Sequence, residues 1–258
     1  MTYSKLPLVH CLATSALFLL AGCGTDSSAH DAVHWSYTGD GEPAHWGDLS
    51  PEYAVAKEGK RQSPIDLTGA QAATEPGELE FVYVPGSLNL VNNGHTIQQN
   101  CDAGSVLKVG EASYDLLQFH FHSASEHTVD GHRFALEMHL VHANEAGELA
   151  VVGVLFDEGD SNEFLAGFFG ELPAKEGATT VNPATSLNPI DVLPEDRSHF
   201  VYDGSLTTPP CSEGVHWFVM SNAVSISSGQ LAQFHELYEG NFRPVQPLNG
   251  RDLLRTGK

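Results

Sequence analysis

Positive charge is scarce in this chain. Its 258 residues include 33 Asp and Glu but only 12 Lys and Arg, which gives a formal net charge of -21 at pH 7. A nucleic-acid-binding protein needs basic side chains to neutralise phosphates, so this charge balance argues against such a partner. The acidity is typical either of a secreted protein kept soluble in a salty or crowded medium or of an ordinary acidic surface.

Long hydrophobic runs are also missing. The apolar run CLATSALFLLAGC at residues 11 to 23 is too short for a permanent transmembrane helix and follows a single lysine, as in a removed signal peptide. Its end, LLAGC, resembles the bacterial lipoprotein signal, in which the cysteine, here Cys23, becomes lipidated. We therefore expect export to the periplasm. A lipid on Cys23 would be the only membrane contact, and the alternatives are an ordinary signal peptide or an uncleaved anchor.

The remaining chain is expected to contain one domain. Residues 1–23 would be the signal peptide, residues 24–32 a flexible polar tether and residues 33–258 the folded domain. The hydrophobic fraction of 41% is enough for one large core, and we find no internal repeats. The oligomeric state is not indicated by any pattern in the sequence.

Cysteine is rare as well, and only Cys101 and Cys211 fall in the expected domain. Two thiols in an oxidising compartment can form a disulfide. A disulfide requires their Cα atoms to lie within about 7 Å of each other, which the sequence spacing does not show. Two separate buried thiols are therefore the equal alternative.

From about residue 78 onward, apolar and polar side chains alternate in short segments separated by Gly, Asn, Asp and Pro. This pattern predicts a mainly β protein. The continuous apolar segment 149–156 predicts a central strand covered on both faces. Helices are expected at 162–172 and at 227–240, where Ser227 and Gln230 fit a capping box, and residues 173–194 are expected to form a surface connection.

Histidine is abundant in one place, since residues 115 to 142 contain six of the 14 histidines. Side chains two residues apart on a strand face the same way, so His120 and His122 share a face. After the Asp130-Gly131 turn signal the chain returns with His139 on a second strand. An antiparallel hairpin would bring the three imidazoles together, leaving a fourth metal position vacant as in catalytic zinc sites.

Two polar side chains fit this metal-site hypothesis. Gln118 lies two residues before His120, and Glu137 lies two residues before His139. Each is placed to accept a hydrogen bond from the outer ring nitrogen of its histidine, as partners of metal ligands usually do. The other histidines of the stretch are expected to be structural; they are His127, His132 and His142.

The chain closely resembles the α-class carbonic anhydrases. The resemblance rests on QFHFHSASEHTVDG, EMHLVH, HWSYTG, KRQSPIDL, NNGHTI, YDGSLTTPPCSEGVHW and NFRPVQPLNGR, which occur in the family's order from about residue 33 onward. It implies an α+β domain built on a large, twisted, mostly antiparallel sheet with few peripheral helices. It also implies an enzyme that hydrates carbon dioxide reversibly to bicarbonate and a proton.

The resemblance implies catalytic roles as well. His120, His122 and His139 match the ligands of one Zn²⁺ per chain. Thr207 matches the threonine that accepts a hydrogen bond from zinc-bound hydroxide and passes its own proton to a carboxylate, here Glu126. The family's histidine proton shuttle is matched by His95, and its water-ordering polar positions are matched by Tyr37, Asn93 and Gln98.

Further matches concern the substrate pocket and the disulfide. The cleft position next to Thr207 is Thr208, and the apolar wall where carbon dioxide rests is matched by Val141, Val151, Leu206, Val215 and Trp217. Secreted members often pair the cysteine after TTPP with one before QSPID, but here that segment offers Ala56. Cys101 is thus the remaining candidate partner for Cys211.

Two other function classes are consistent with the same residues. Non-catalytic binding relatives of the family typically lose a zinc histidine, whereas all three are present in this chain. A zinc-dependent esterase, or a lipoprotein that sequesters zinc, would use the same histidines. Ester cleavage without carbon dioxide hydration would favour the esterase, and much more than one zinc per chain would favour sequestration.

Overall fold

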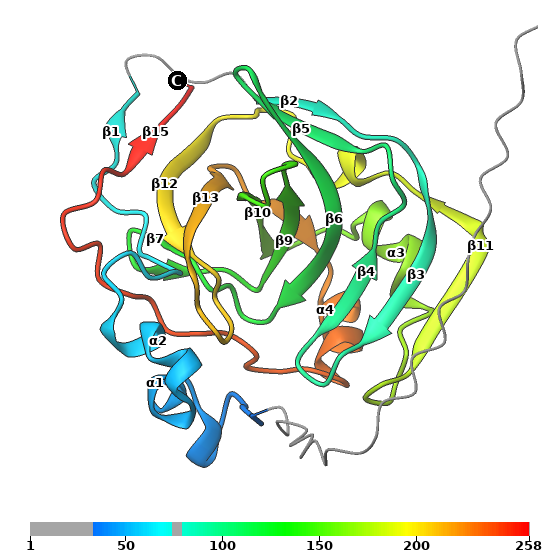
Figure 1. Cartoon of the computed structure of the whole chain (residues 1–258). Coiled ribbons are helices and arrows are strands. Elements are labelled where there is room, and N and C mark those ends of the chain that lie inside the picture. The colour runs from blue at the N-terminus through cyan, green and yellow to red at the C-terminus, as the bar shows by residue number, and fades with distance from the viewer. Residues whose placement is uncertain (1–32, 74–78, 258) are drawn as a thin grey trace, which may run out of the picture. The chain divides into compact units, whose positions relative to one another are not determined.

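The computed structural model describes residues 33–73 and 79–257, which are built around one large sheet (Figure 1). The expected signal peptide and tether lie outside the described residues. In sheet order the main strands are β1 (Gln71–Ala72), β15 (Leu254–Arg255), β12 (His199–Ser205), β13 (Glu213–Met220), β10 (Leu149–Glu158), β9 (Leu136–Ala143), β6 (Ala112–His122), β4 (Ile97–Asn100), β3 (Gly86–Asn92) and β11 (Thr179–Leu187).

Shorter strands extend this sheet. β2 (Leu79–Val82) pairs with β5 (Val106–Val109), β5 pairs with β6, and β14 (Val224–Ile226) pairs with β10. A separate two-stranded sheet contains β7 (Thr128–Val129) and β8 (His132–Arg133). Parallel pairing occurs between β1 and β15 and between β10 and each of β13 and β14, while the other pairs are antiparallel. The expected mostly antiparallel sheet is therefore confirmed.

The predicted central strand is β10, whose residues 150–156 are all buried. It lies between β9 and β13 and is covered on both faces, which explains its continuous apolar sequence. β6 instead alternates, so that Phe119 and Phe121 enter the larger hydrophobic core while His120 and His122 face the other way. The pleat of this strand therefore separates the core from the histidine side chains.

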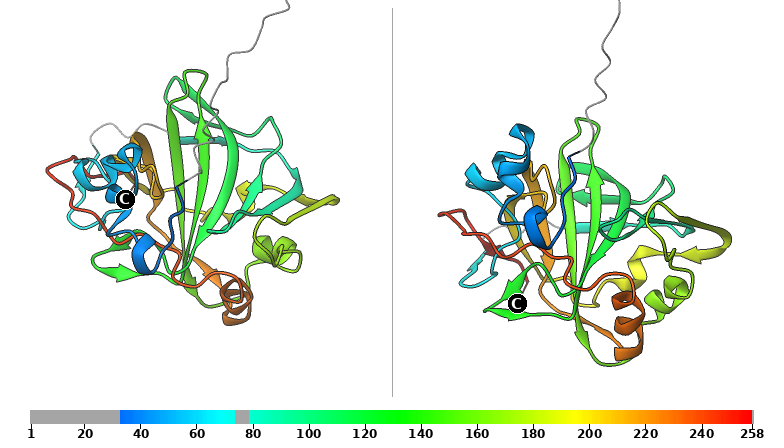
Figure 2. Two further views of the ribbon diagram at one scale, coloured as in Figure 1. Left: turned by 60° about the horizontal axis from the view of Figure 1, so that its bottom comes forward. Right: turned by 90° about the horizontal axis from the view of Figure 1, so that it is seen from below.

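The helices are few and peripheral, as expected. They are α1 (Trp46–Leu49), α2 (Val55–Glu58), α3 (Glu163–Phe169) and α4 (Ser228–His235), with 3₁₀ turns η1 (Gly39–Gly41), η2 (Pro51–Tyr53) and η3 (Pro189–Val192). Figure 2 shows α1 and α2 on one side of the domain and α3 and α4 on the other. The Ser227–Gln230 capping box is confirmed, but α4 ends at His235, five residues before the predicted end at residue 240.

One prediction about the connections is wrong. Residues 173–194 are more than a surface connection, because they contain β11, which pairs with β3 at the sheet edge. Pro183 lies where the register shifts between Asn182 and Ser186, and an edge strand with a bulge accommodates proline. Among the described residues, no helix is long and apolar enough to cross a membrane.

Cys101 and Cys211 are both free thiols, so the disulfide between them is not formed. Cys101 directly follows β4, whereas Cys211 lies in the loop between β12 and β13. Strands β10, β9 and β6 separate β13 from β4 in the sheet. Since neighbouring strands are about 4.8 Å apart, this separation far exceeds the reach of a disulfide.

Candidate metal centre

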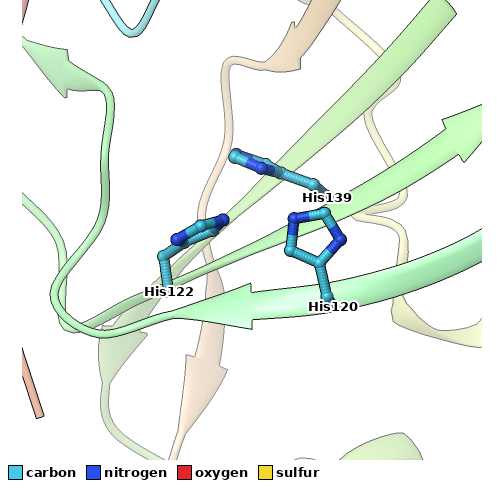
Figure 3. A group of neighbouring side chains, drawn as sticks. All are labelled: His120, His122 and His139. Carbon is cyan, nitrogen blue, oxygen red and sulfur yellow. The ribbon is translucent and has the colours of Figure 1, made fainter. Parts of the chain in front are cut away.

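The hairpin of β6 and β9 brings three histidines together. His120 and His139 are directly opposite each other in the antiparallel register, and His122 lies one pleat further along β6. Figure 3 shows the three rings turned toward one another from these two strands. One nitrogen from each ring can be chosen so that all three lie within 4.8 Å of one another. The convergence predicted from the sequence alternation is therefore present.

The outer nitrogen of each ring has a hydrogen-bond partner. His120 Nδ1 lies 2.9 Å from Gln118 Oε1, and His139 Nε2 lies 2.8 Å from Glu137 Oε1. These are the two contacts expected from the sequence. A third contact joins His122 Nδ1 to the backbone oxygen of Asn241 at 2.8 Å. It was not predicted, because the two residues are 119 positions apart in the sequence.

These contacts leave one nitrogen of each ring free to bind a metal. His122 Nε2 is buried and has no hydrogen-bond partner among the described residues. Burial, together with the neighbouring imidazoles, lowers the pKa of His120 well below its usual value, and burial lowers the pKa of His122 to about 4. Neutral rings with an unused lone pair are the donors that zinc prefers. The residues therefore fit a zinc ion.

Glu137 supports the site through both carboxylate oxygens. Oε1 also lies 2.7 Å from His127 Nδ1, and Oε2 accepts hydrogen bonds of 2.8 Å from the amides of Glu126 and His127. Burial favours the neutral form, but His127 and His139 hold the pKa of Glu137 well below its usual value. A second metal group of His127, Glu137 and His139 is geometrically available, but its atoms already hydrogen-bond to one another.

His127 is structural, as predicted, because its second ring nitrogen lies 2.7 Å from the hydroxyl of Tyr202. His142 is likewise buried with both nitrogens paired, to the hydroxyl of Tyr83 at 2.7 Å and the backbone oxygen of Ala150 at 3.1 Å. His132 is exposed and lies 3.5 Å from Asp157. None of the three belongs to the group of free donors.

Glu126 lies beside the three rings, with Oε2 3.6 Å from His122 Nε2 and 3.9 Å from His139 Nδ1. Its other oxygen accepts a 2.8 Å hydrogen bond from the amide of Arg243. Burial raises the pKa of Glu126 to about 7, although His139, the Arg243 amide and the Thr207 hydroxyl favour its charged form. The structure thus places Thr207 and Glu126 together next to the histidines.

A cavity of about 120 Å³ opens beside the rings of His120 and His122. It is lined by all the residues expected to belong to the proton path, which are Tyr37, Asn93, His95 and Gln98. Thr208 lines it as well. Trp35, for which no role was predicted from the sequence, also lines the cavity and stacks on His95 with a centroid distance of 3.6 Å. Trp35 belongs to the HWSYTG motif, and its aromatic ring was the feature of the sequence from which this contact could have been predicted.

The expected apolar wall forms one cluster next to the metal ligands. Val151, Val215 and Trp217 are buried in the smaller hydrophobic core, and Val141 and Leu206 pack against it. The Trp217 ring lies 4.8 Å from the ring of His139, measured between centroids.

Comparison with known proteins agrees with this geometry. A family model described as eukaryotic-type carbonic anhydrase matches residues 41–257. The carbonic anhydrase of Pectobacterium carotovorum is 40% identical over 242 residues, covering 93% of this chain and 98% of that protein.

Solved structures show the same similarity. The alpha-carbonic anhydrase of Photobacterium profundum is 44% identical, with a TM-score of 0.81 over 86% of this chain and 100% of that one. The alpha-carbonic anhydrase of Thermovibrio ammonificans, solved with the inhibitor sulfanilamide, is 41% identical, with a TM-score of 0.82 over 86% of this chain and 99% of that one. The chain therefore belongs to the alpha carbonic anhydrase family of enzymes.

Proposed function

We propose that this enzyme hydrates carbon dioxide reversibly to bicarbonate and a proton, using one zinc ion held by His120, His122 and His139. The proposal depends on one observation. Three imidazoles converge, of which those of His122 and His139 are buried and that of His120 is half-buried, and the outer nitrogen of each is paired while the inner one is free. When bound there, zinc would lower the pKa of a coordinated water to about 7, the value known for carbonic anhydrases, and thus supply a nucleophile at neutral pH.

Thr207 and Glu126 would orient the attacking oxygen. In this proposal, the Thr207 hydroxyl donates a hydrogen bond to the Glu126 carboxylate and would accept one from the attacking oxygen. The amide of Arg243 holds Glu126 in place with a 2.8 Å hydrogen bond. Fixing the lone pair of the nucleophile in this way reduces the reorientation needed to reach the transition state.

The apolar cluster fits the substrate. Carbon dioxide is linear and uncharged, so hydrogen bonds give it little affinity and an apolar surface suits it better. Val141, Val151 and Trp217 offer such a surface next to the ring of His139. Leu206, Val215 and Thr208 would complete the substrate pocket.

His95 would carry the product proton away from the cavity. Burial and the neighbouring His34 lower its pKa below the usual value, so its ring is mostly neutral at pH 7 and can accept a proton. Tyr37, Asn93 and Gln98 line the same cavity and would order the water chain that leads to it.

The decisive experiment is stopped-flow carbon dioxide hydration combined with zinc analysis of the mature protein. We expect one zinc per chain, and we expect His139→Ala to lose both the zinc and most of the activity. His132→Ala removes an exposed histidine of the same stretch, so it should retain both.

Several results would contradict the proposal. They are hydration by His139→Ala equal to that of the parent, folded parent protein that binds no zinc, and ester cleavage without carbon dioxide hydration. Much more than one zinc per chain would favour sequestration.

We further propose that the enzyme is exported to the periplasm and anchored through a lipid on Cys23. The support is the apolar run at residues 11 to 23 and its LLAGC ending. Mass spectrometry of the membrane fraction should detect an N-terminal diacylglyceryl cysteine. An unmodified protein that begins elsewhere would contradict the anchor.

A further inference from the structure

The turn that carries His95 is fastened to a second loop by Asn92, which is 3% exposed. The Asn92 amide donates to the oxygen of Ala178 at 3.0 Å, and its carbonyl accepts from the amide of Gly177 at 2.8 Å. Its side-chain nitrogen donates to the oxygen of Pro173 at 2.9 Å, and its side-chain oxygen accepts from the amide of Gly94 at 3.2 Å. Residues 92–95 and 173–178 are therefore held together.

Glu176 lies at the tip of the fastened loop, next to Gly94. A methyl group added to Gly94 would lie 2.7 Å from Glu176 Oε1, so the carboxylate rests against the residue that precedes His95. Gly94 also has a φ of +86°, which favours glycine at this position. The sequence NNGHTI thus provides both the turn and the space that the Glu176 carboxylate occupies.

We propose that Glu176 is a functional part of the proton path, in which its carboxylate acts as the counter-charge for His95 when that ring carries a proton. This inference rests on the proposed shuttle role of His95. Glu176 is a positioning residue in this proposal, because it acts through His95 and touches neither the metal ligands nor the substrate pocket.

The charges around His95 support this role. Burial lowers the pKa of His95, the neighbouring His34 lowers it further, and Glu176 raises it. Trp35, whose ring stacks on His95, is uncharged. Glu176 therefore offsets the two effects that disfavour the protonated ring, and keeps His95 a better proton acceptor than its surroundings alone would allow.

The test is a charge series at position 176 in the zinc-loaded protein. The pKa of His95 is measured by NMR, with its resonance assigned from its absence in His95→Ala. Glu176→Gln should lower this pKa by roughly 0.2–0.7, the shift expected for loss of one exposed opposite charge, and Glu176→Lys should lower it about twice as far. Glu176→Asp keeps the charge and should stay close to the parent.

Two controls separate charge from structure. Glu145→Gln removes a charge from the exposed turn between β9 and β10 and should leave the pKa of His95 unchanged. At about 1 M salt, where the screening length is about 3 Å, the difference between the parent and Glu176→Gln should largely disappear. A structural effect would persist at high salt.

Turnover provides a second measurement. In dilute buffer, Glu176→Gln should lower kcat by roughly two-fold and leave kcat/KM unchanged, because proton removal follows the hydration step. An unchanged His95 pKa across the series would overturn the inference. If His95→Ala itself has normal kcat in dilute buffer, the shuttle proposal fails instead, so the two failures are distinguishable.

Discussion

His95 combines partial burial with access to the cavity beside the candidate zinc ligands. Replacing it with alanine should lower kcat in dilute buffer by about 10-fold or more, because general acid-base groups typically contribute large factors. The value of kcat/KM should change little, and added imidazole should restore part of the rate. Stopped-flow measurements in weak and strong buffer test this, and a lack of rescue would count against the shuttle.

The same residue predicts a pH dependence. A shuttle must be neutral to accept the proton, so kcat for hydration should fall as the pH falls through the pKa of His95. Since that pKa is lowered by burial, the midpoint should lie below the usual value of about 6.5. The pH profile of kcat in the parent, compared with His95→Ala, checks both the direction and the residue.

His142 predicts a stability effect that is independent of zinc. Burial lowers its pKa to about 4, whereas the unfolded chain has a histidine pKa near 6.5. Below about pH 6.5 the unfolded state binds the proton first, so the folded state loses about 3 kcal/mol of stability between pH 6.5 and 4. Above pH 6.5 the ring is neutral in both the folded and the unfolded state, so no stability is lost.

The measurement is the free energy of unfolding in denaturant at several pH values. His142→Gln removes the titrating group while keeping a polar side chain near Tyr83. Its stability should be lower than that of the parent at pH 7 but should decline less on acidification. Parallel pH profiles for the two proteins would contradict the assignment.

At the scale of elements, β6 joins the core to the metal site. Phe121 packs against Phe168 and Phe169 of α3 and Phe234 of α4, at centroid distances of 5.6, 6.0 and 5.9 Å. Phe121→Ala should lower the free energy of unfolding by about 3–5 kcal/mol, because it leaves a cavity beneath the strand. Loosening this strand should also weaken zinc binding by its neighbours His120 and His122.

Leu117 provides the matched control on the same strand, since it is 48% exposed. Leu117→Ala should change stability by no more than about 0.5 kcal/mol and leave zinc binding intact. Denaturant unfolding of both variants, followed by zinc titration, makes the comparison. A similar loss in both would show that β6 does not depend on the aromatic packing of α3 and α4.

Local sequence patterns predicted the strands around the histidines and two of the four helices, but not α1, α2 or β12. Alternation identified β6 and β9, and Ser227 and Gln230 identified the beginning of α4, because these signals act over a few residues. β11 was missed because its proline-containing sequence reads as a connection. Only the pairing of β11 with β3 at the sheet edge makes it a strand, and that pairing joins segments about 90 residues apart in the chain.

For the whole molecule, zinc should stabilise but should not be required for folding. The sheet and its two hydrophobic cores contain most of the buried side chains, and the histidines occupy one face of one hairpin. A ligand present at about 1,000 times its Kd adds roughly 4 kcal/mol. Chelation should therefore lower the melting temperature and abolish activity, and zinc should restore both.

Calorimetry and circular dichroism before and after chelation test this prediction. His139→Ala is the control, because its melting temperature should not respond to zinc. Loss of the β-sheet signal on chelation at room temperature would mean that the metal holds the fold together. The expected outcome follows from where the apolar burial lies.

The sequence by itself determined the parts that depend on short-range periodicity and motif spacing. The alternation of β6 and β9 placed His120, His122 and His139 with Gln118 and Glu137, because a strand fixes which neighbours share a face. Only the tertiary structure decided the contacts between distant segments. Four features depend on how loops pack across the sheet, which no local pattern encodes. They are the Asn241 carbonyl on His122, the Trp35 ring on His95, the Glu176 carboxylate near His95 and the separation of Cys101 from Cys211.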